Sequence, residues 1–322
     1  MSPNFMQMPW LQLIRWQNLL IILITQLLAW WCVILPLSPQ VLTPVNFSCL
    51  ALSTALIAAA GYIINDYFDV KIDSINRPER VVLAKAIPRK QAIVSHIALN
   101  VAAVILAGFV AAAAHHLSLL LIQLGSILLL WFYSTHFKRM FMIGNVVVAL
   151  LTALTVATLI FYEPAVLRHC QYPAMEETSL DYLDVNPFWL LMVYSLFAFM
   201  LNWMREIVKD LEDLKGDAEE GCDTMPVKWG ISRTLGFVRV LGGITLVYLL
   251  FCELELFSLG NKLLGLYILL LVVAPIVVWL IGLGKKLTTI HFHRSSTQLK
   301  LMMLSGVLSL IVYYCIIWIR SY

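Results

Sequence analysis

The first long apolar stretch, residues 16–65, reads WQNLLIILITQLLAWWCVILPLSPQVLTPVNFSCLALSTALIAAAGYIIN and contains no Asp, Glu, Lys or Arg. A membrane-spanning helix needs about 20 consecutive apolar residues. This stretch is therefore long enough for two crossings, separated by the polar, proline-bearing segment 36–46. Residues 91–137 form a second charge-free stretch of the same kind. Shorter charge-free windows follow at 140–162, 185–204, 240–252, 263–284 and 301–319.

These windows predict an all-α, polytopic membrane protein with nine transmembrane helices. We expect them near residues 11–35, 47–66, 91–114, 117–135, 143–162, 186–208, 234–252, 263–284 and 300–320. The composition agrees, because 61% of the residues are hydrophobic and only 13% are charged, whereas soluble proteins average about 25% charged residues. A large soluble enzyme, a disordered chain and a nucleic-acid-binding protein are excluded on this ground.

The basic residues indicate the orientation of the chain in the membrane. Of the 22 Lys and Arg residues, all except Arg168, Lys262 and Arg320 lie near the amino end or in the connections after the second, fourth, sixth and eighth helices. Cytoplasmic loops are enriched in Lys and Arg. We therefore expect a cytoplasmic amino terminus, an external carboxyl terminus, and a location in the plasma membrane.

Two acidic motifs with the same spacing follow the second and sixth predicted helices. They read NDYFDVKID at 65–73 and KDLEDLKGD at 209–217. The spacing places three carboxylates within about 60° of one helix face if the helices continue through the motifs. Four crossings separate the motifs, so both face the cytoplasm. We accordingly predict a single domain over 1–322 that repeats a four-helix unit, at about 11–135 and 143–284, before the ninth helix at 300–320.

Clustered carboxylates at the carboxyl end of a helix are unfavourable, because they oppose the helix dipole and repel each other. A pair of Mg²⁺ ions would neutralise them, and Mg²⁺ prefers a few carboxylates together with waters and substrate phosphates. The motifs therefore predict a magnesium–diphosphate site. The six aspartates that we expect to bind metal and to be catalytic are Asp66, Asp69, Asp73, Asp210, Asp213 and Asp217.

With nine helices, the motifs N-D-x-x-D-x-x-x-D at 65–73 and D-x-x-x-D at 213–217 resemble those of the UbiA superfamily of intramembrane prenyltransferases. The likeness extends to Asn76–Arg80, to Tyr133-Ser134 with Lys138-Arg139 and Gly144-Asn145, and to Arg15 and Asn18 near the first helix. Residues 205–217 and 224–226 are similar to digeranylgeranylglyceryl phosphate synthases within that superfamily. The chain departs from the family at 80–85, which read RVVLAK where the family often has R-P-x-P-S-G.

The resemblance implies a Mg²⁺-dependent enzyme that transfers a polyprenyl group, best assigned as geranylgeranyl, from its diphosphate to a lipid acceptor such as geranylgeranylglyceryl phosphate. Basic and amide side chains would donate hydrogen bonds to the diphosphate, and an aromatic ring would face the allylic cation. The substrate-binding residues that we expect are Asn18, Asn65, Arg80, Tyr133, Lys138 and Arg139. Arg15, Arg205 and Lys209 are possible contacts of an acceptor phosphate.

Two other functions remain open at this point. An aromatic prenyltransferase of quinone or pigment biosynthesis, acting on a 4-hydroxybenzoate-type acceptor, would share the same metal site. A cation transporter would place its carboxylates near the bilayer midplane, whereas these aspartates lie at predicted helix ends. The expected partners are the prenyl diphosphate donor, the lipid or aromatic acceptor and the bilayer, with no nucleic acid and no protein partner.

Overall fold

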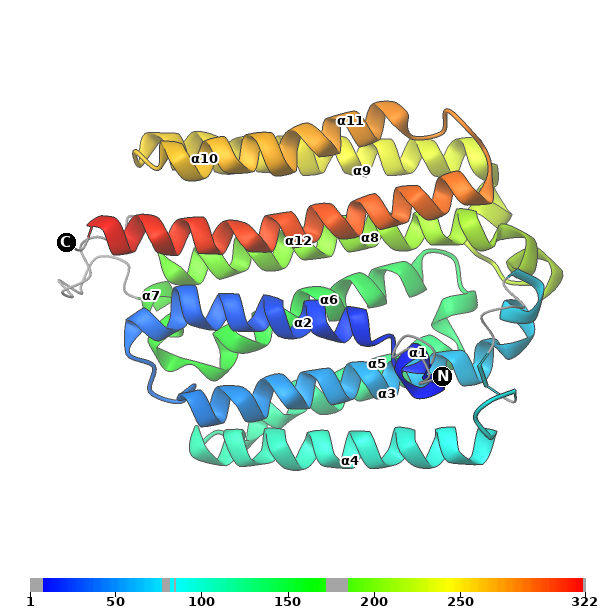
Figure 1. The fold of residues 1–322 in the computed structure, drawn as a ribbon, viewed down its shortest axis with the longest axis horizontal. Coiled ribbons are helices and arrows are strands. Elements are labelled where there is room, and N and C mark those ends of the chain that lie inside the picture. The colour runs from blue at the N-terminus through cyan, green and yellow to red at the C-terminus, as the bar shows by residue number, and fades with distance from the viewer. Residues whose placement is uncertain (1–7, 77–81, 84, 172–184, 321–322) are drawn as a thin grey trace, which may run out of the picture. The chain divides into compact units, whose positions relative to one another are not determined.

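The computed structural model describes residues 8–76, 82–83, 85–171 and 185–320. Within these residues every named element is a helix, and the only strand-like feature is an isolated bridge between Leu83 and Ile87. Nine helical segments in the described part of the chain are long and apolar enough to cross a membrane. The all-α prediction with nine spans is therefore confirmed (Figure 1).

The helices cluster into two compact units. One comprises Met1–Ile24, Val41–Val148 and Asp213–Lys228, and the other Thr25–Gln40, Ala149–Glu212 and Trp229–Tyr322. The elements in chain order are α1 (Pro9–Leu13), α2 (Trp16–Ala29), η2 (Trp30–Ile34), η3 (Leu35–Leu37), α3 (Pro44–Asn76), α4 (Arg89–Ala113), η4 (Leu117–Leu119), α5 (Leu120–Thr135), η5 (Phe137–Arg139), α6 (Ile143–Tyr162), α7 (Pro164–Gln171), α8 (Pro187–Glu219), α9 (Met225–Ser258), α10 (Lys262–Ile268), η6 (Leu269–Val273), α11 (Ala274–Gly282) and α12 (Thr289–Arg320). The predicted single domain with a repeated four-helix unit stays a prediction.

In the first unit, α3 packs against α4 and α5 (Figure 1). Small residues on α3 allow this close approach: a Cβ atom on Gly61 would come within 2.9 Å of the Leu130 side chain on α5. Polar contacts are made inside the helix group, where the Ser53 hydroxyl donates to the Ala103 carbonyl at 2.8 Å. On the outer side of α4, Ile105 is 66% exposed. Such apolar surface is suited to lipid.

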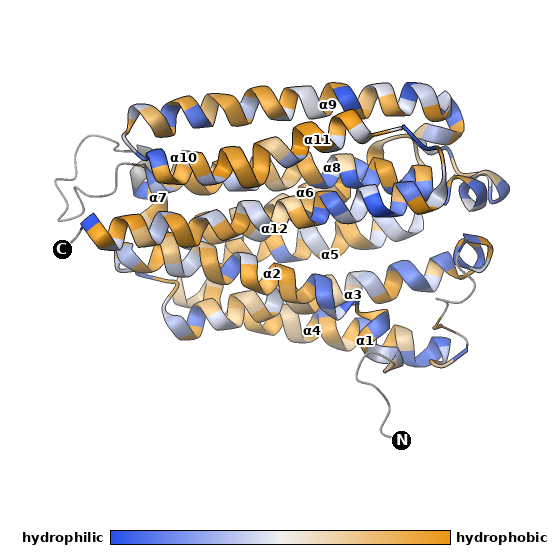
Figure 2. Cartoon of the chain, turned by 45° about the horizontal axis from the view of Figure 1, so that its top comes forward, coloured by the Kyte–Doolittle hydropathy of each residue, from blue (hydrophilic) through white to orange (hydrophobic). Residues whose placement is uncertain are grey.

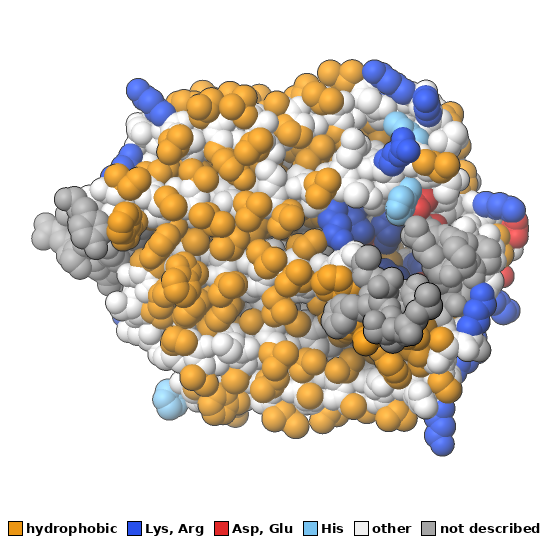
Figure 3. Space-filling model, in the orientation of Figure 1, with side chains coloured by type: hydrophobic (Ala, Val, Ile, Leu, Met, Phe, Trp, Pro, Cys, Tyr) orange, Lys and Arg blue, Asp and Glu red, His pale blue; other side chains and the backbone are white. Residues whose placement is uncertain are grey.

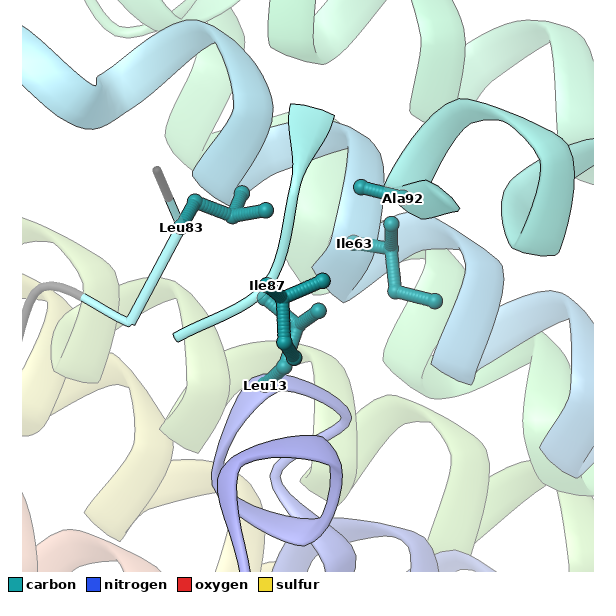
Figure 4. Packing of buried hydrophobic residues seen from close by; sticks show 5 residues of the cluster. All are labelled: Leu13, Ile63, Leu83, Ile87 and Ala92. Atoms are coloured by element: carbon teal, nitrogen blue, oxygen red, sulfur yellow. The ribbon is translucent and has the colours of Figure 1, made fainter. Parts of the chain in front are cut away.

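A small apolar cluster joins α1, α3, α4 and the segment before α4. It consists of Leu13, Ile63, Leu83, Ile87 and Ala92, all buried (Figure 4). The segment forms a turn in which the Ala86 N–H donates to the Val82 carbonyl at 2.9 Å. In the segment where the UbiA superfamily often has proline and glycine, this chain has Leu83, whose apolar side chain packs in the cluster with Ile63 of α3.

In the second unit, α12 packs against η2, α10, η6 and α11. A Cβ atom on Gly306 of α12 would overlap the Phe197 ring of α8, so the glycine permits close helix packing. Buried polar side chains pair across the helices, as in the hydrogen bond from the Trp279 indole N–H to the Ser295 hydroxyl at 2.7 Å. Apolar side chains cover much of the surface over the long helices (Figure 3).

Several helix boundaries differ from the predicted ones. The second and sixth spans do not end near residues 66 and 208 but continue to Asn76 and Glu219, and α9 and α12 begin earlier than predicted. The first predicted span, 11–35, is interrupted between α1 and α2. Hydrophilic residues gather toward one end of α3 and of α8 (Figure 2). Hydropathy windows stop at the first charged residue, whereas the backbone hydrogen bonds of a helix continue past it.

Candidate active site

The first aspartate motif lies on α3, which continues through it as one helix. Asp66, Asp69 and Asp73 therefore share one helix face, as their spacing predicted. Asp69 is only 4% exposed. On the same helix, Tyr67 and Val70 pack against the apolar cluster of Figure 4. This packing holds the motif-bearing turns of α3 in place.

The Asp69 carboxylate has two partners. Lys138 on η5 makes an ion pair and hydrogen bond to Asp69 through its Nζ, and Asn65 donates its Nδ2 to the same carboxylate oxygen at 2.6 Å. Burial by itself would lower the pKa of the Lys138 ammonium, but the charge of Asp69, aided by Tyr133 and Asp73, outweighs burial and raises that pKa above the ordinary lysine value. Lys138 therefore remains charged at neutral pH.

A close backbone contact places Lys138. Gly144 lies at the start of α6, against the preceding connection, and a Cβ atom there would come within 2.8 Å of the Phe137 carbonyl oxygen and 3.0 Å of the Lys138 Cα. Any side chain at Gly144 would push η5 away from α6. The glycine quoted from the sequence thus has a structural role, because it sets the position from which Lys138 reaches Asp69.

Asp66 pairs with Arg15, which lies between α1 and α2. The Arg15 Nη2 is 2.8 Å from Asp66 Oδ1, and its guanidinium lies 4.9 Å from the centre of the Tyr62 ring. Arg15 has a φ of 51°, in the left-handed region that non-glycine residues rarely adopt. Burial alone would lower the pKa of Arg15, but Asp66 and Tyr62 outweigh it and raise the pKa. The structure thus assigns Arg15 to Asp66, whereas the sequence suggested an acceptor contact.

The second motif lies on α8, which also continues through it. Asp213 and Asp217 belong to the same compact unit as the first motif. Asp217 is 4% exposed and interacts electrostatically with Lys138 and Asp69. Lys138 therefore lies among carboxylates from both motifs. Asp210 is one turn earlier on α8, in the segment that belongs to the other unit, and its role stays a prediction.

Asn76 links the two motif-bearing helices directly. Its Nδ2 donates to the Asp213 carbonyl at 3.2 Å, and the Gly216 N–H donates to its Oδ1 at 2.9 Å. A Cβ atom on Gly216 would lie 2.5 Å from the Asn76 Nδ2, so only glycine fits under this amide. The sequence pointed to Asn76 only because the segment Asn76–Arg80 resembles the corresponding segment of the UbiA superfamily. No local pattern could pair two residues that lie 140 positions apart.

The residues of this unit suit Mg²⁺ by their chemistry. The carboxylates offer only oxygen atoms, the ligands that Mg²⁺ prefers. The Asn65 Oδ1 is buried and has no hydrogen-bond partner among the described residues, and a buried acceptor of this kind requires one. In the described part of the chain, no three His, Cys, Asp or Glu side chains are gathered closely enough to hold a metal by themselves. Asp69 and Asp66 are instead held by Lys138 and Arg15.

Comparison with known proteins assigns the family. The model of the UbiA prenyltransferase family matches residues 23–306. The chain belongs to the UbiA prenyltransferase family. It is 31% identical over 264 residues to a digeranylgeranylglyceryl phosphate synthase of Saccharolobus solfataricus, covering 81% of this chain and 82% of the relative. A protein of the same name from Pyrococcus abyssi is 35% identical over 189 residues, which cover 59% of this chain and 58% of that relative.

Solved structures of UbiA-type proteins share the fold of this family member. A digeranylgeranylglyceryl phosphate synthase structure superposes with a TM-score of 0.62 at 22% identity, covering 95% of this chain and 97% of the other. A UbiA homologue from Archaeoglobus fulgidus bound to DMAPP and Mg²⁺ superposes with a TM-score of 0.56 at 17% identity, covering 95% of this chain and all of the other. Membership of the family, together with the nine apolar helices found among the described residues, makes this UbiA protein a multi-pass integral membrane prenyltransferase.

The other predicted substrate-binding residues of this UbiA prenyltransferase occupy separate positions. Tyr133, at the end of α5, interacts electrostatically with Lys138. The Arg139 carbonyl accepts a hydrogen bond from the Asp223 N–H at 2.8 Å, beside the loop that follows α8. Asn18 lies in the first turn of α2, where its main-chain N–H donates to the Arg15 carbonyl at 2.7 Å. Arg80 lies outside the described residues.

Proposed function

We propose that this UbiA prenyltransferase transfers a geranylgeranyl group from geranylgeranyl diphosphate to geranylgeranylglyceryl phosphate. The observation that carries the donor site is the position of Lys138, a partly buried cation among carboxylates of both aspartate motifs. The relatives named digeranylgeranylglyceryl phosphate synthase support the acceptor. The Archaeoglobus fulgidus homologue bound to DMAPP and Mg²⁺ supports a prenyl diphosphate donor and a magnesium requirement.

The six motif aspartates would hold Mg²⁺, which when bound neutralises the charge that develops on the departing diphosphate. Lys138, Arg139 and Arg80 donate hydrogen bonds to diphosphate oxygens, with Asn65 as a neutral donor. Because Asp69 keeps Lys138 charged and oriented, this cation needs little reorganisation when charge develops on the diphosphate. Asn18 and Tyr133 complete the predicted substrate contacts, with the Tyr133 ring facing the allylic carbon.

In the proposed reaction, the bond between the allylic C1 of the donor and its diphosphate oxygen breaks, and the diphosphate leaves with the electron pair. The free hydroxyl oxygen of the acceptor forms a new bond to C1 and loses its proton to the medium. The products are the dialkylated glycerol phosphate and inorganic diphosphate. Exclusion of bulk water matters here, because water would otherwise capture the allylic cation.

The distribution of basic residues supports an orientation for the membrane protein. Nineteen of the 22 Lys and Arg residues lie on the side that carries both aspartate motifs. By the tendency of cytoplasmic loops to be basic, the amino terminus and the active site face the cytoplasm, and the carboxyl terminus faces outward. We place the protein in the plasma membrane. Its prenyl donor would enter from the bilayer, so the apolar tail need not cross water.

The test uses purified full-length protein in lipid nanodiscs with Mg²⁺, radiolabelled geranylgeranyl diphosphate and geranylgeranylglyceryl phosphate. We expect Asp69→Asn and Asp217→Asn to lower kcat/KM about 100-fold or more, as expected when about 3 kcal/mol of transition-state stabilisation is lost. Asp223→Asn is the matched control, because the Asp223 side chain is 59% exposed and its carboxylate pairs with Lys228 at the surface. It should leave transfer unchanged.

A parallel reaction offers 4-hydroxybenzoate in place of the glycerol phosphate acceptor. Transfer to this aromatic compound but not to geranylgeranylglyceryl phosphate would overturn the proposed acceptor and favour the aromatic alternative. Wild-type activity in Asp69→Asn would overturn the proposed donor site. Loss of activity in Asp223→Asn as well would show that the assay reports general damage to the fold.

A further inference from the structure

A buried carboxylate lies outside the aspartate motifs, toward the end of α9 in the second compact unit. Glu253 is 4% exposed, and both of its carboxylate oxygens are buried without a hydrogen-bond partner among the described residues. Buried carboxylates in proteins are normally paired or hydrogen-bonded, and an ionisable side chain within a membrane-spanning helix usually marks a functional site. Glu253 therefore requires a partner that the described side chains do not supply.

Glu253 faces α10, which lies beside α9 (Figure 1). A Cβ atom on Gly265 of α10 would lie 2.9 Å from Glu253 Oε2 and 3.1 Å from the Phe257 ring, so the glycine leaves room for both side chains. Phe257 lies one turn after Glu253 on α9, and Asn261 lies one turn before Gly265, whose N–H donates to its carbonyl at 3.0 Å. Because the two helices run in opposite directions, Asn261 lies at the level of Phe257, about one turn from Glu253.

Asn261 brings a buried hydrogen-bond donor to this contact between α9 and α10. It is as buried as Glu253, and its Nδ2 has no hydrogen-bond partner in the described part of the chain. Its main-chain N–H donates to the Leu256 carbonyl at 2.9 Å, which fixes Asn261 against the end of α9. The next residue, Lys262, is exposed. The contact thus offers a carboxylate and, one turn farther out, an amide N–H beside a lysine ammonium.

These groups suit a ligand that carries both charges. A primary ammonium donates charge-assisted hydrogen bonds to a carboxylate such as Glu253, and the Phe257 ring attracts a cation as well. Asn261 and Lys262 are donors, and they suit the oxygens of a phosphate. A metal ion would satisfy the carboxylate but not the amide N–H. In a phosphoethanolamine group, two carbon atoms join the ammonium to the phosphate, which matches a separation of about one helical turn.

The surroundings of the contact indicate a lipid as the source of this group. Leu254, next to Glu253, is 71% exposed, and Leu263 at the start of α10 is also exposed. Such apolar side chains on membrane-spanning helices face the acyl chains. Glu253 lies five residues before the last residue of α9, Ser258, or about 7.5 Å of helix rise. Phe257 is 43% exposed, so rotation of its ring opens the carboxylate toward the headgroup layer.

We propose that the contact between α9 and α10 binds a phospholipid whose headgroup carries a primary ammonium. The ammonium pairs with Glu253, and the phosphate accepts hydrogen bonds from Asn261 and Lys262. The bound lipid joins the two helices at their connected ends and thereby stabilises the second compact unit. None of these residues belongs to the aspartate motifs, so the inference does not depend on the proposed function.

The experiment places the full-length protein in phosphatidylcholine nanodiscs, with and without added phosphatidylethanolamine. A ligand that binds only the folded state raises the melting temperature, and we expect phosphatidylethanolamine to raise that of the wild type by about 2–4 °C. Glu253→Gln should abolish this rise. In native mass spectrometry, the ratio of retained phosphatidylethanolamine to phosphatidylcholine should fall about 10-fold or more, as expected for the loss of one charge-assisted hydrogen bond.

Two further variants separate lipid binding from damage to the fold. Glu255→Gln is the matched control, since Glu255 is exposed two positions later on α9, and it should keep the wild-type response. Gly265→Ala should lose the response as Glu253→Gln does, because its Cβ would displace the Glu253 carboxylate. In phosphatidylcholine alone, Glu253→Gln should melt at the wild-type temperature or above, because it removes an unpaired buried charge.

Three results would overturn the inference. The first is an equal response of the wild type to phosphatidylglycerol, which has no ammonium, or no preference for phosphatidylethanolamine over phosphatidylcholine, whose choline group has no N–H donor. The second is a full response in Glu253→Gln, or its loss in Glu255→Gln. The third is a rise in melting temperature caused by soluble phosphoethanolamine and lost in Glu253→Gln, which would assign the site to a free zwitterion and not to a lipid.

Discussion

Replacement of Gly216 by alanine tests whether the two aspartate motifs act as one rigid unit. In the wild type, the Asn76 amide bridges α3 and α8 through hydrogen bonds to the Gly216 N–H and the Asp213 carbonyl, at 2.9 and 3.2 Å. An alanine Cβ would lie 2.5 Å from Asn76 Nδ2 and 2.8 Å from its Cγ. These distances are too short for van der Waals contact, so the Asn76 side chain must leave and both hydrogen bonds are lost.

The change in folding free energy expected for Gly216→Ala is the sum of two opposing contributions. Two lost hydrogen bonds cost about 2 kcal/mol of folding free energy, whereas alanine in place of glycine inside a helix returns about 1 kcal/mol. We therefore expect Gly216→Ala to destabilise the protein by only about 1 kcal/mol. Catalysis is more sensitive, because a shift of about 1 Å in a catalytic group can cost about 100-fold in rate. The expected result is a 10- to 100-fold lower kcat/KM with a small change in melting temperature.

The assay pairs prenyl transfer with thermal unfolding in nanodiscs. Gly243→Ala on α9 is the control, since a Cβ atom there meets nothing within 4 Å. It should keep full activity and be as stable as the wild type or slightly more so. Asn76→Ala should lose activity to the same extent as Gly216→Ala, and the double variant should lose no more, because both changes remove the same bridge. Full activity in Gly216→Ala would refute the idea that this bridge aligns the motifs.

Three further predictions concern the cations and the connection that positions them. Lys138→Met should lower stability by about 3 kcal/mol, because it leaves the Asp69 carboxylate buried without its cation, while Lys138→Arg should retain most of it in thermal melts. Because the Lys138 pKa is raised, the contribution of Lys138 to folding stability is complete at pH values below the ordinary lysine pKa and is lost only at higher pH. The difference in melting temperature between wild type and Lys138→Met should therefore be constant from about pH 6 to 9. A difference that vanishes near neutral pH would contradict the assignment of a charged lysine. Gly144→Ala should lower transfer activity about 10-fold by displacing η5. Binding of the acceptor, measured in the absence of the prenyl donor, should change little. Arg15→Gln should raise KM for the diphosphate less than Lys138→Gln does, because Arg15 interacts with aspartates of the first motif only, whereas Lys138 interacts with aspartates of both. An equal rise would show that both cations contact the diphosphate.

Much of the fold was predictable because the membrane imposes a simple local rule. Every crossing must be apolar over about 20 residues, and the charge-free windows display this directly. The ends of the helices were not predictable in the same way. Asp66 and Arg205 are the first charged residues after their apolar windows, yet α3 and α8 continue to Asn76 and Glu219. Long-range partners such as Lys138, Arg15 and Asn76 stabilise these charged helix ends, and hydropathy contains no information about them.

The sequence by itself determined the class of the protein, the number of its crossings and the residue types available for chemistry. The identical spacing of the two aspartate motifs was enough to predict that carboxylates share a helix face, since that depends only on the helical repeat. Tertiary structure decided which cation meets which carboxylate: Lys138 with Asp69 and Arg15 with Asp66. It also joined Asn76 to Gly216, which lie 140 positions apart in the sequence. Periodicity is a property of neighbouring residues, whereas ion pairing depends on contacts between distant segments that only the packed helices bring together.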